Sequence, residues 1–341
     1  MKILVTGGAG FIGSHTIIEL ANAGFESIII DNFSNSDISV IKGLEQILGF
    51  PVKYYQEDCN NSEILEQIII NEKIEGVIHF AAFKAVGESV EKPLDYYRNN
   101  VTSTLTLLDV MLKTGVTNFV FSSSCTVYGQ PETIPVTELT PRQQATSPYG
   151  NTKVICEDII RDTVASKVAL KAIALRYFNP VGAHPSGLIG ELPRGVPSNL
   201  VPFVTQTAVG IRKKLTIYGN DYDTPDGTCI RDFIHVVDLA KAHVAALTFL
   251  KEQDSTSSYD VYNIGTGKGN TVLELINLFE KVSGQQLNYV IGERRAGDIE
   301  KIFGNVDKAS TILKWKSQKT LEESIIDAWR WQLKLCSDDI V

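Results

Sequence analysis

Short apolar runs alternate with longer amphipathic stretches through the first half of the chain. The runs are rich in Ile, Val and aromatic residues, and each is separated from the next by enough residues for a crossover helix. Such β-α-β repetition predicts an α/β fold in which helices cover both faces of a doubly wound parallel sheet. We expect buried strands at residues 3–5, 27–30, 52–55, 77–80, 118–121 and 172–176.

The pattern changes after Asn179-Pro180. Residues 181–198 contain several glycines and prolines, which are typical of loops. We therefore expect two domains, a doubly wound domain at residues 1–180 and a smaller mixed α/β domain at residues 181–341. Residues 234–250 have a helical pattern, and we expect the segment 234–262 to pack back on the first domain.

The composition excludes several classes of protein. With 43% hydrophobic and 21% charged residues, the 341-residue chain has an ordinary globular composition. The net charge of −8 argues against a general binder of nucleic acid or of anionic membranes. The sequence has no apolar run of about 18 residues, the length that a bilayer span needs. The first residues are typical of a strand that enters a glycine turn, so we expect no signal peptide.

Cysteine and histidine usage indicates the compartment and argues against a metal site. The five cysteines include no C-x-x-C pair, and their odd number predicts free thiols in a reducing compartment. We therefore expect a cytoplasmic protein. The five histidines show no H-E-x-x-H or other metal-ligand spacing, so we expect no metal ion.

A glycine pattern near the N-terminus predicts a dinucleotide site. Gly7, Gly10 and Gly13 directly follow the first strand, where glycine permits a tight turn and leaves a helix N-terminus free to hold a pyrophosphate. Asp31 ends the second strand, and an acidic residue roughly 20 residues after the glycines is expected to bind the ribose. A carboxylate there would repel a 2′-phosphate. The sequence therefore predicts a Rossmann-type domain that binds NAD rather than NADP.

Tyr149 and Lys153 carry the predicted chemistry. Four residues apart on a helix, they share one face. A phenol titrates near ~10, but a nearby ammonium and an oxidised nicotinamide ring would both favour the phenolate. Tyr149 would then take a hydroxyl proton while the dinucleotide takes a hydride. A bare Tyr-x-x-x-Lys also occurs by chance, and the pair gains weight from Ser124, which follows the fifth strand, where open α/β sheets place their ligands.

On these motifs the chain resembles the extended short-chain dehydrogenase/reductases and, within them, the UDP-glucose (UDP-galactose) 4-epimerase family. The resemblance covers nearly the whole chain. Its matching elements are Thr6-Gly7-Gly8-Ala9-Gly10-Phe11-Ile12-Gly13-Ser14-His15, Asp31-Asn32, His79-Phe80-Ala81-Ala82, Ser147-Pro148-Tyr149-Gly150, Arg176-Tyr177-Phe178-Asn179, Arg231-Asp232-Phe233-Ile234-His235-Val236 and Arg294-Arg295-Ala296-Gly297-Asp298.

The resemblance implies a role for each matching residue. Tyr149 would be the acid and base, Lys153 would lower its pKa and hold the nicotinamide ribose, and Ser124 would orient the sugar hydroxyl. The implied NAD-binding residues are Gly7, Gly10, Phe11, Ile12, Gly13, Asp31, Asn32, Asn35, Asp58, Phe80, Ala81, Lys84, Asn99, Ser122, Tyr149, Lys153, Tyr177 and Phe178. The implied UDP-sugar residues are Ser124, Tyr149, Asn179, Asn199, Leu200, Tyr218, Arg231, Arg295, Asp298 and Ile302.

The chemistry of a pyrophosphate agrees with the arginines in this set, because it calls for bidentate cations. For Lys84, Asn99 and Tyr218 the residues alone fit a surface or packing role equally well, and their assignment rests on the resemblance.

The implied reaction is the interconversion of UDP-glucose and UDP-galactose by inversion at C4 through a 4-keto sugar, with tightly held NAD. In the family, the position of Ile302 gates the sugar 2-substituent, a bulky Tyr restricting the pocket to plain hexoses. Ile is smaller than Tyr, so activity on UDP-GlcNAc and UDP-GalNAc is left open. The resemblance also implies a homodimer built on a pair of helices, for which the apolar stripe Leu105, Leu108, Met111 and Leu112 is a candidate.

Other functions remain open beside this one. A nucleotide-sugar 4,6-dehydratase shares the fold and the Tyr–Lys pair, but that family has an Asp-Glu pair where this chain has Cys125 and Thr126. A UDP-sugar acid epimerase or decarboxylase is a further alternative, although no residue independently marks a sugar carboxylate site. A catalytically silent NAD-binding regulator or a sugar-nucleotide scaffold would have no need of Ser124, Tyr149 and Lys153 together.

Overall fold

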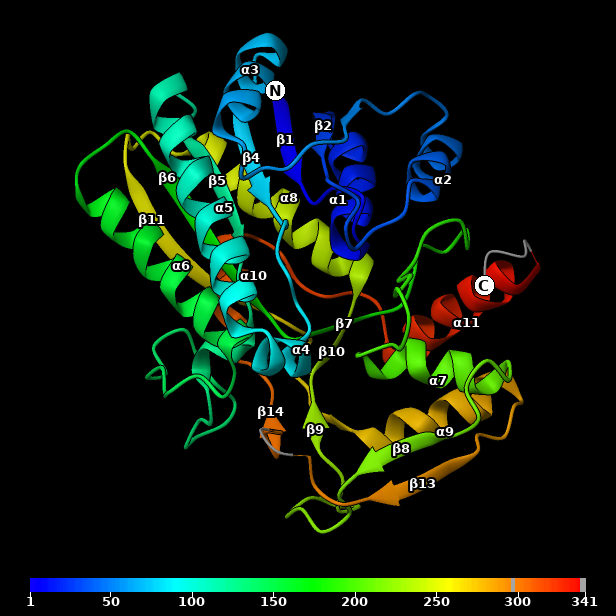
Figure 1. Cartoon of the computed structure of the whole chain (residues 1–341). Helices are drawn as coiled ribbons and strands as arrows, with labels where there is room; N and C mark the ends of the chain where they lie inside the picture. The colour runs from blue at the N-terminus through cyan, green and yellow to red at the C-terminus, as the bar shows by residue number, and fades with distance from the viewer. Residues whose placement is uncertain (296–297, 338–341) are drawn as a thin grey trace.

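A seven-stranded parallel sheet forms the centre of the larger part of the molecule (Figure 1). The computed structural model describes residues 1–295 and 298–337; Ala296 and Gly297 of the Arg-Arg-x-Gly-Asp motif and residues 338–341 lie outside the described residues. The predicted doubly wound α/β class is confirmed. In spatial order the strands are β11 (Ser258–Ile264), β6 (Lys171–Tyr177), β5 (Asn118–Ser122), β4 (Gly76–His79), β1 (Lys2–Thr6), β2 (Glu26–Ile30) and β3 (Tyr54–Tyr55).

All six strands predicted for the first half are present, and a seventh was not predicted. β3 is shorter than expected, although the amide of Ile29 still bonds to the carbonyl of Lys53 at 3.0 Å. The missed strand, β11, pairs with β6 at the edge of the sheet. Its first four residues are only half-buried, so polar residues such as Asp260 interrupt the apolar run on which prediction of a buried strand depends.

Helices cover both faces of this sheet. One face packs against α1 (Phe11–Asn22), α2 (Ser39–Leu48) and α8 (Val236–Glu252), and the other against α3 (Ser62–Glu72), α5 (Pro93–Thr114) and α6 (Pro148–Ala165). α8 lies alongside α1 (Figure 1). Residues 236–264 therefore return from the smaller region to the sheet, while the domain boundary at residue 180 stays a prediction.

The smaller region holds a separate apolar core. Its helices are α7 (Leu200–Ala208), α9 (Val272–Ser283) and α11 (Leu321–Ser337). Its short strands are β7 (Asn179–Val181) with β10 (Phe233–His235), β8 (Leu215–Tyr218) with β13 (Tyr289–Gly292), and β9 (Ile230–Arg231) with β12 (Asn270–Thr271) and β14 (Lys301–Ile302). Three short helices complete the described elements: α4 (Val86–Glu91), η1 (Cys125–Tyr128) and α10 (Asp307–Ile312).

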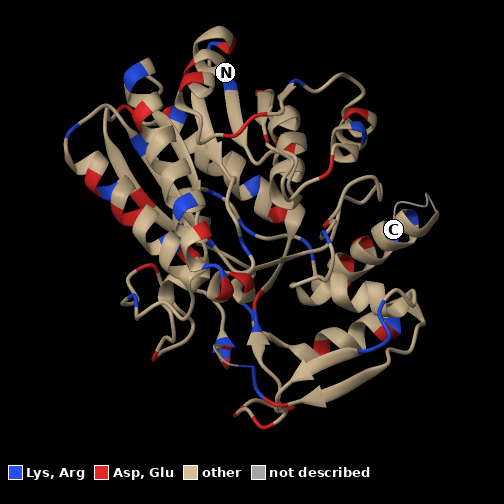
Figure 2. Ribbon diagram, in the orientation of Figure 1, with Lys and Arg blue, Asp and Glu red and all other residues tan. Residues whose placement is uncertain are grey.

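Lys and Arg are interspersed with Asp and Glu on α5 and α6, whereas α1 and α3 carry only acidic charges (Figure 2). Within the described residues, no helix is both long and apolar enough to cross a bilayer. The smaller region lies beyond the carboxyl ends of the parallel strands (Figure 1), where α/β sheets of this kind bind their ligands.

Candidate active site

The turn between β1 and α1 is a close-packed glycine loop. Gly7 has a φ of +68°, and a Cβ there would lie 2.8 Å from the amide nitrogen of Ala81. A Cβ on Gly13 would lie 2.3 Å from the carbonyl oxygen of Gly7, so no larger residue fits. The N-cap of α1 is Gly10, which has no side chain with which to cap the helix. The first amides of α1 are therefore available to a phosphate, as the dinucleotide prediction requires.

Asp31 organises the loop that follows β2. Its Oδ2 accepts from the amide of Ala9 at 3.0 Å, and its Oδ1 accepts from the amide of Phe33 and from Ser36 Oγ, both at 2.9 Å. A carboxylate offers about four lone-pair sites, so capacity remains for one ribose hydroxyl. Asn32 donates to Asp58 Oδ2 at 3.2 Å, which brings a second predicted carboxylate to this loop.

The other predicted dinucleotide residues lie at the ends of β5 and β6, on the loops that follow the strands and, for Asn99, in α5. Ser122 and Tyr177 end β5 and β6, and their hydroxyl oxygens are 2.5 Å apart. Phe80 and Ala81 follow β4, and Phe178 follows β6. Asn35 is exposed on the loop after Asp31. Lys84 and Asn99 are engaged by protein partners, Lys84 by Glu191 and Asn99 by Asn100.

The start of α6 places the candidate catalytic pair. Ser147 caps the helix by accepting from the amide of Gly150 at 3.2 Å, and Pro148 occupies the first turn, a combination that is typical of helix starts. Tyr149 and Lys153 follow one turn apart, and both are buried. Lys153 Nζ donates to the carbonyl of Ser122 at 2.7 Å and lies 5.9 Å from the centre of the Tyr149 ring.

Burial dominates the electrostatics of this pair. It raises the pKa of the Tyr149 phenol above its usual value, while a hydrogen bond with Ser124 opposes the rise. It lowers the pKa of Lys153 to about 8, and the negative charge of Glu157 acts in the opposite direction. The side chains alone thus favour a neutral phenol. The lowered Tyr149 pKa expected from the sequence stays a prediction for the dinucleotide-loaded protein, where the nicotinamide charge would favour the phenolate.

Glu157 continues the same face of α6 and was not among the predicted site residues. Its Oε1 accepts from Ser123 Oγ at 2.6 Å, and its two oxygens accept from Arg176 Nε at 2.9 Å and Nη2 at 2.6 Å. Arg176 also donates to the hydroxyl of Tyr128 at 3.2 Å. Ser123 directly precedes Ser124, so this buried carboxylate fixes the turn that presents Ser124 to Tyr149. The four-residue spacing of Tyr149, Lys153 and Glu157 places all three on one helix face, and this spacing could have indicated Glu157 from the sequence.

Three predicted UDP-sugar residues, Arg231, Arg295 and Tyr218, gather near the carboxylate of a fourth, Asp298. Asp298 Oδ1 accepts from Arg295 Nη2 at 2.6 Å and lies 4.0 Å from Arg231 Nη2. The Arg295 guanidinium lies 5.4 Å from the centre of the Tyr218 ring. Two guanidinium groups that share one carboxylate keep unmatched positive charge, which is the environment that a diphosphate prefers.

The remaining predicted substrate residues outside the catalytic pair and Ser124 lie at the ends of short elements of the smaller region. Asn179 begins β7, while Asn199 is the N-cap of α7 and Leu200 its first residue. Asn199 Nδ2 donates to Glu191 Oε1 at 2.6 Å, and Glu191 is a second site residue that was not predicted. Ile302 is buried in an apolar cluster with Cys125 and Phe178. Cys125 directly follows Ser124 in the sequence.

The positions where dehydratases carry two carboxylates have no acidic group. Burial raises the pKa of the Cys125 thiol to about 12, so it stays protonated at neutral pH. Thr126 Oγ1 is buried and has no hydrogen-bond partner among the described residues. Over residues 1–295 and 298–337, no group of three His, Cys, Asp or Glu side chains could hold a metal ion.

Residues 4–328 match the family model described as GDP-mannose 4,6 dehydratase. The chain belongs to the extended short-chain dehydrogenase/reductases. The UDP-glucose 4-epimerases of Dictyostelium discoideum and Bacillus subtilis are each 51% identical to it, covering 97% of the chain and 95% and 97% of their own lengths. The UDP-glucose 4-epimerase of Bifidobacterium longum, in complex with NAD⁺ and UDP, has a TM-score of 0.94, 48% identity and 98% coverage of both chains. Within its class, the chain belongs to the UDP-glucose 4-epimerase family, as its motifs predicted.

Proposed function

We propose that this protein interconverts UDP-glucose and UDP-galactose by inverting C4 of the hexose through a 4-keto sugar. The observation that carries the proposal is the buried Tyr149–Lys153 pair beside Ser124, between the glycine turn and the arginines around Asp298. The similarity to 4-epimerases extends over the whole site-bearing part of the chain. The reaction is an isomerisation, and the enzyme is an epimerase that acts on a nucleotide sugar.

The residues fit NAD as the cofactor. The first amides of α1 would hold its pyrophosphate, and Asp31 would take a ribose hydroxyl while disfavouring a 2′-phosphate. Lys153 would hold the nicotinamide ribose. Bound there, NAD supplies a reversible hydride acceptor for C4 of the sugar.

The chain's own residues handle the proton and the orientation of the sugar. Tyr149 Oη takes the proton of the 4-hydroxyl and later returns it, and Ser124 holds that oxygen in place. Arg231 and Arg295 fix the diphosphate, so the keto sugar can turn about its link to UDP and present its other face. A site that binds the nucleotide tightly and the hexose weakly allows this rotation, because most of the binding energy then comes from contacts away from the reacting carbon.

The direct test gives the purified protein UDP-galactose without added NAD and follows UDP-glucose by NMR. Conversion would support both the epimerase and a retained cofactor. If UDP-glucose fails to form even with NAD supplied, the proposal is wrong. Formation of a 4-keto-6-deoxy sugar would favour a dehydratase instead, a reaction for which Cys125 and Thr126 supply no acid or base.

Arg231→Ala is expected to weaken UDP binding by about tenfold or more, because a charge-assisted contact to phosphate is worth roughly 1.5–3 kcal/mol. Titration calorimetry with UDP measures this. Lys113→Ala, which removes a cation paired with Glu66 at 2.6 Å on the opposite side of the sheet from α8, is the control. Unchanged UDP affinity in the Arg231 variant would exclude the diphosphate role.

We also propose that Ile302 leaves room for a 2-acetamido group, so that UDP-GlcNAc and UDP-GalNAc are substrates as well. Ile302→Tyr should then lower kcat/KM for UDP-GlcNAc by about 10-fold or more while leaving that for UDP-glucose within a few-fold, because overpacking a buried site costs about 1–3 kcal/mol. Paired assays on both sugars measure the ratio. An equal effect on the two substrates would show that Ile302 does not select the 2-substituent.

The assembly and the compartment remain proposals as well. We propose a homodimer through α5 and α6: Leu105 and Leu112 of the apolar stripe are exposed, whereas Leu108 and Met111 belong to the core. We further propose a cytoplasmic location, which the five free cysteines support. The net charge of −8 gives no reason to expect nucleic-acid or membrane partners.

A further inference from the structure

One segment of the smaller region reaches both candidate ligand sites. Residues 191–199, here called the strap, lead into the N-terminus of α7. Arg194 donates through Nη1 to the carbonyl of Ser34 at 3.2 Å and through Nη2 to the carbonyl of Ser36 at 2.5 Å. These two carbonyls flank Asn35, a predicted dinucleotide residue. The strap is thereby fastened to the loop that Asp31 holds through Ser36.

Glu191 makes a second connection. Its Oε1 accepts from Lys84 Nζ at 2.7 Å and from Asn199 Nδ2 at 2.6 Å. Lys84 is a predicted residue of the dinucleotide site, and Asn199 is one of the UDP-sugar site. Both bonds are charge-assisted, and the Glu191 side chain that accepts them is only 10% exposed, whereas that of Lys84 is 45% exposed. A single carboxylate oxygen therefore joins the two sites.

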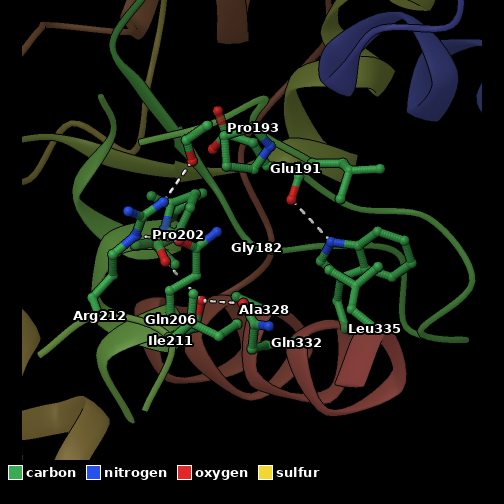
Figure 3. Close-up of a pocket in the computed structure, with 16 residues that line it drawn as sticks. Gly182, Glu191, Pro193, Pro202, Gln206, Ile211, Arg212, Ala328, Gln332 and Leu335 are labelled. Atoms are coloured by element: carbon green, nitrogen blue, oxygen red, sulfur yellow. Dashed lines mark hydrogen bonds between the residues drawn. The ribbon is translucent and has the colours of Figure 1, made fainter. Parts of the chain in front are cut away.

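The strap is held by hydrogen bonds over a cavity. From below, Trp331 Nε1 donates to the carbonyl of Glu191 at 3.0 Å, and Arg212 Nη2 donates to the carbonyl of Gly195 at 2.6 Å. Beneath these bonds lies a cavity of about 220 Å³ between the strap, α7 and α11 (Figure 3). A segment above a cavity has few packed atoms beneath it, so it breaks few van der Waals contacts when it moves away. The strap can therefore lift when its polar contacts open.

We propose that the strap retains the dinucleotide between turnovers, and that Glu191 makes this retention respond to the nucleoside diphosphate. UDP that engages Asn199 would fix the Glu191 carboxylate, which in turn holds Lys84 at the dinucleotide site. The inference rests on the proposed function for the identity of the two ligands. It assigns Glu191 and Arg194 as positioning residues, because they act through Lys84, Asn199 and the loop after β2.

The first test measures dinucleotide release without turnover. Protein loaded with NADH is mixed with excess NAD, and the loss of bound NADH fluorescence is followed. Arg194→Ala should release NADH at least about tenfold faster than wild type, since it loses two hydrogen bonds from a charged donor. Arg194→Lys, which cannot bond to both carbonyls, should release NADH at a rate between those of wild type and Arg194→Ala. NADH release from both variants at the wild-type rate would overturn the proposal that the strap retains the dinucleotide.

Arg161→Ala is the matched control for this test. Its guanidinium pairs with Asp158 and Asp162 on its own helix, so its loss should leave NADH release unchanged. Release accelerated equally by the control would show that the Arg194 effect is general destabilisation and would also count against the strap.

The second test addresses the coupling. UDP should slow NADH release from wild type severalfold, and Glu191→Gln should lose most of that slowing because the amide carries no charge for Lys84. Glu66→Gln, which breaks the Lys113 pair instead, should respond like wild type. Equal slowing in Glu191→Gln and wild type would refute the coupling. Release is measured without catalysis, so a protein that retains NADH in this way but fails to convert UDP-galactose would refute only the proposed function.

Discussion

Tyr149→Phe is expected to lower kcat by about 10²- to 10⁴-fold, the contribution typical of a positioned acid or base. The substitution removes only the hydroxyl, since the ring stays packed on the face of α6 that carries Lys153. UDP affinity should be nearly unchanged, because the arginines around Asp298 lie elsewhere in the site. Turnover of UDP-galactose and calorimetric titration with UDP measure the two effects separately.

Tyr55→Phe provides the matched control for this prediction. It also removes a phenol hydroxyl, one that donates to Glu72 at 2.5 Å on the far edge of the sheet, and it should leave kcat nearly unchanged because this hydroxyl bonds outside the candidate site. A Tyr149→Phe enzyme that keeps kcat within tenfold of wild type would remove Tyr149 from the proton-transfer role. A loss of UDP affinity matching the loss of kcat would point to a collapsed site.

Glu157→Gln is expected to destabilise the protein by about 3–5 kcal/mol, because it leaves the buried guanidinium of Arg176 without its counter-charge. Thermal unfolding compared with Glu66→Gln, an exposed pair worth at most about 1 kcal/mol, measures the effect. The double variant Glu157→Gln, Arg176→Met should recover part of the lost stability, since removing both buried charges destabilises a protein far less than leaving one of them unpaired. Equal stability of the single and double variants would contradict this account.

The same substitution should alter the pH dependence of catalysis. Burial lowers the pKa of Lys153 to about 8, and the charge of Glu157 raises it. Without that charge the Lys153 pKa falls further, so the ammonium is lost at a lower pH and the alkaline limb of the kcat/KM profile shifts downward. Ser123→Ala, which removes the bond to Glu157 Oε1 but not the charge, should lower kcat and leave the position of this limb unchanged.

The features that could be predicted from the sequence are those encoded within a short stretch of chain. The buried strands of the sheet are continuous apolar runs, and each predicted run became a strand at its expected place. β11 was missed because its first four residues are only half-buried and include the polar Asp260. In a similar way, Gly7, Gly13 and Asp31 were found because a tight turn and a ribose contact demand particular residue types at nearly fixed spacing.

The residues that were missed act over long separations. Glu191 meets Lys84 across 107 positions, and Arg194 meets Ser34 across 160. Neither belongs to a local motif, and a single exposed-looking charge in a Gly- and Pro-rich loop is indistinguishable from a solvated one. Glu157 differs, because it lies one turn from Lys153 on the same helix face. Only its partner Arg176, brought in by the neighbouring strand, shows what the carboxylate does.

The return of residues 236–264 to the sheet also bears on how the protein is made. α8 covers α1, and β11 pairs with β6, so the first 180 residues leave an apolar helix face and a strand edge uncovered. During synthesis these surfaces stay uncovered until the ribosome, which adds about 5–20 residues per second, has produced residue 264. A nascent chain stalled before that point therefore presents an open strand edge, a template for pairing with other chains, which makes it a natural client for a chaperone.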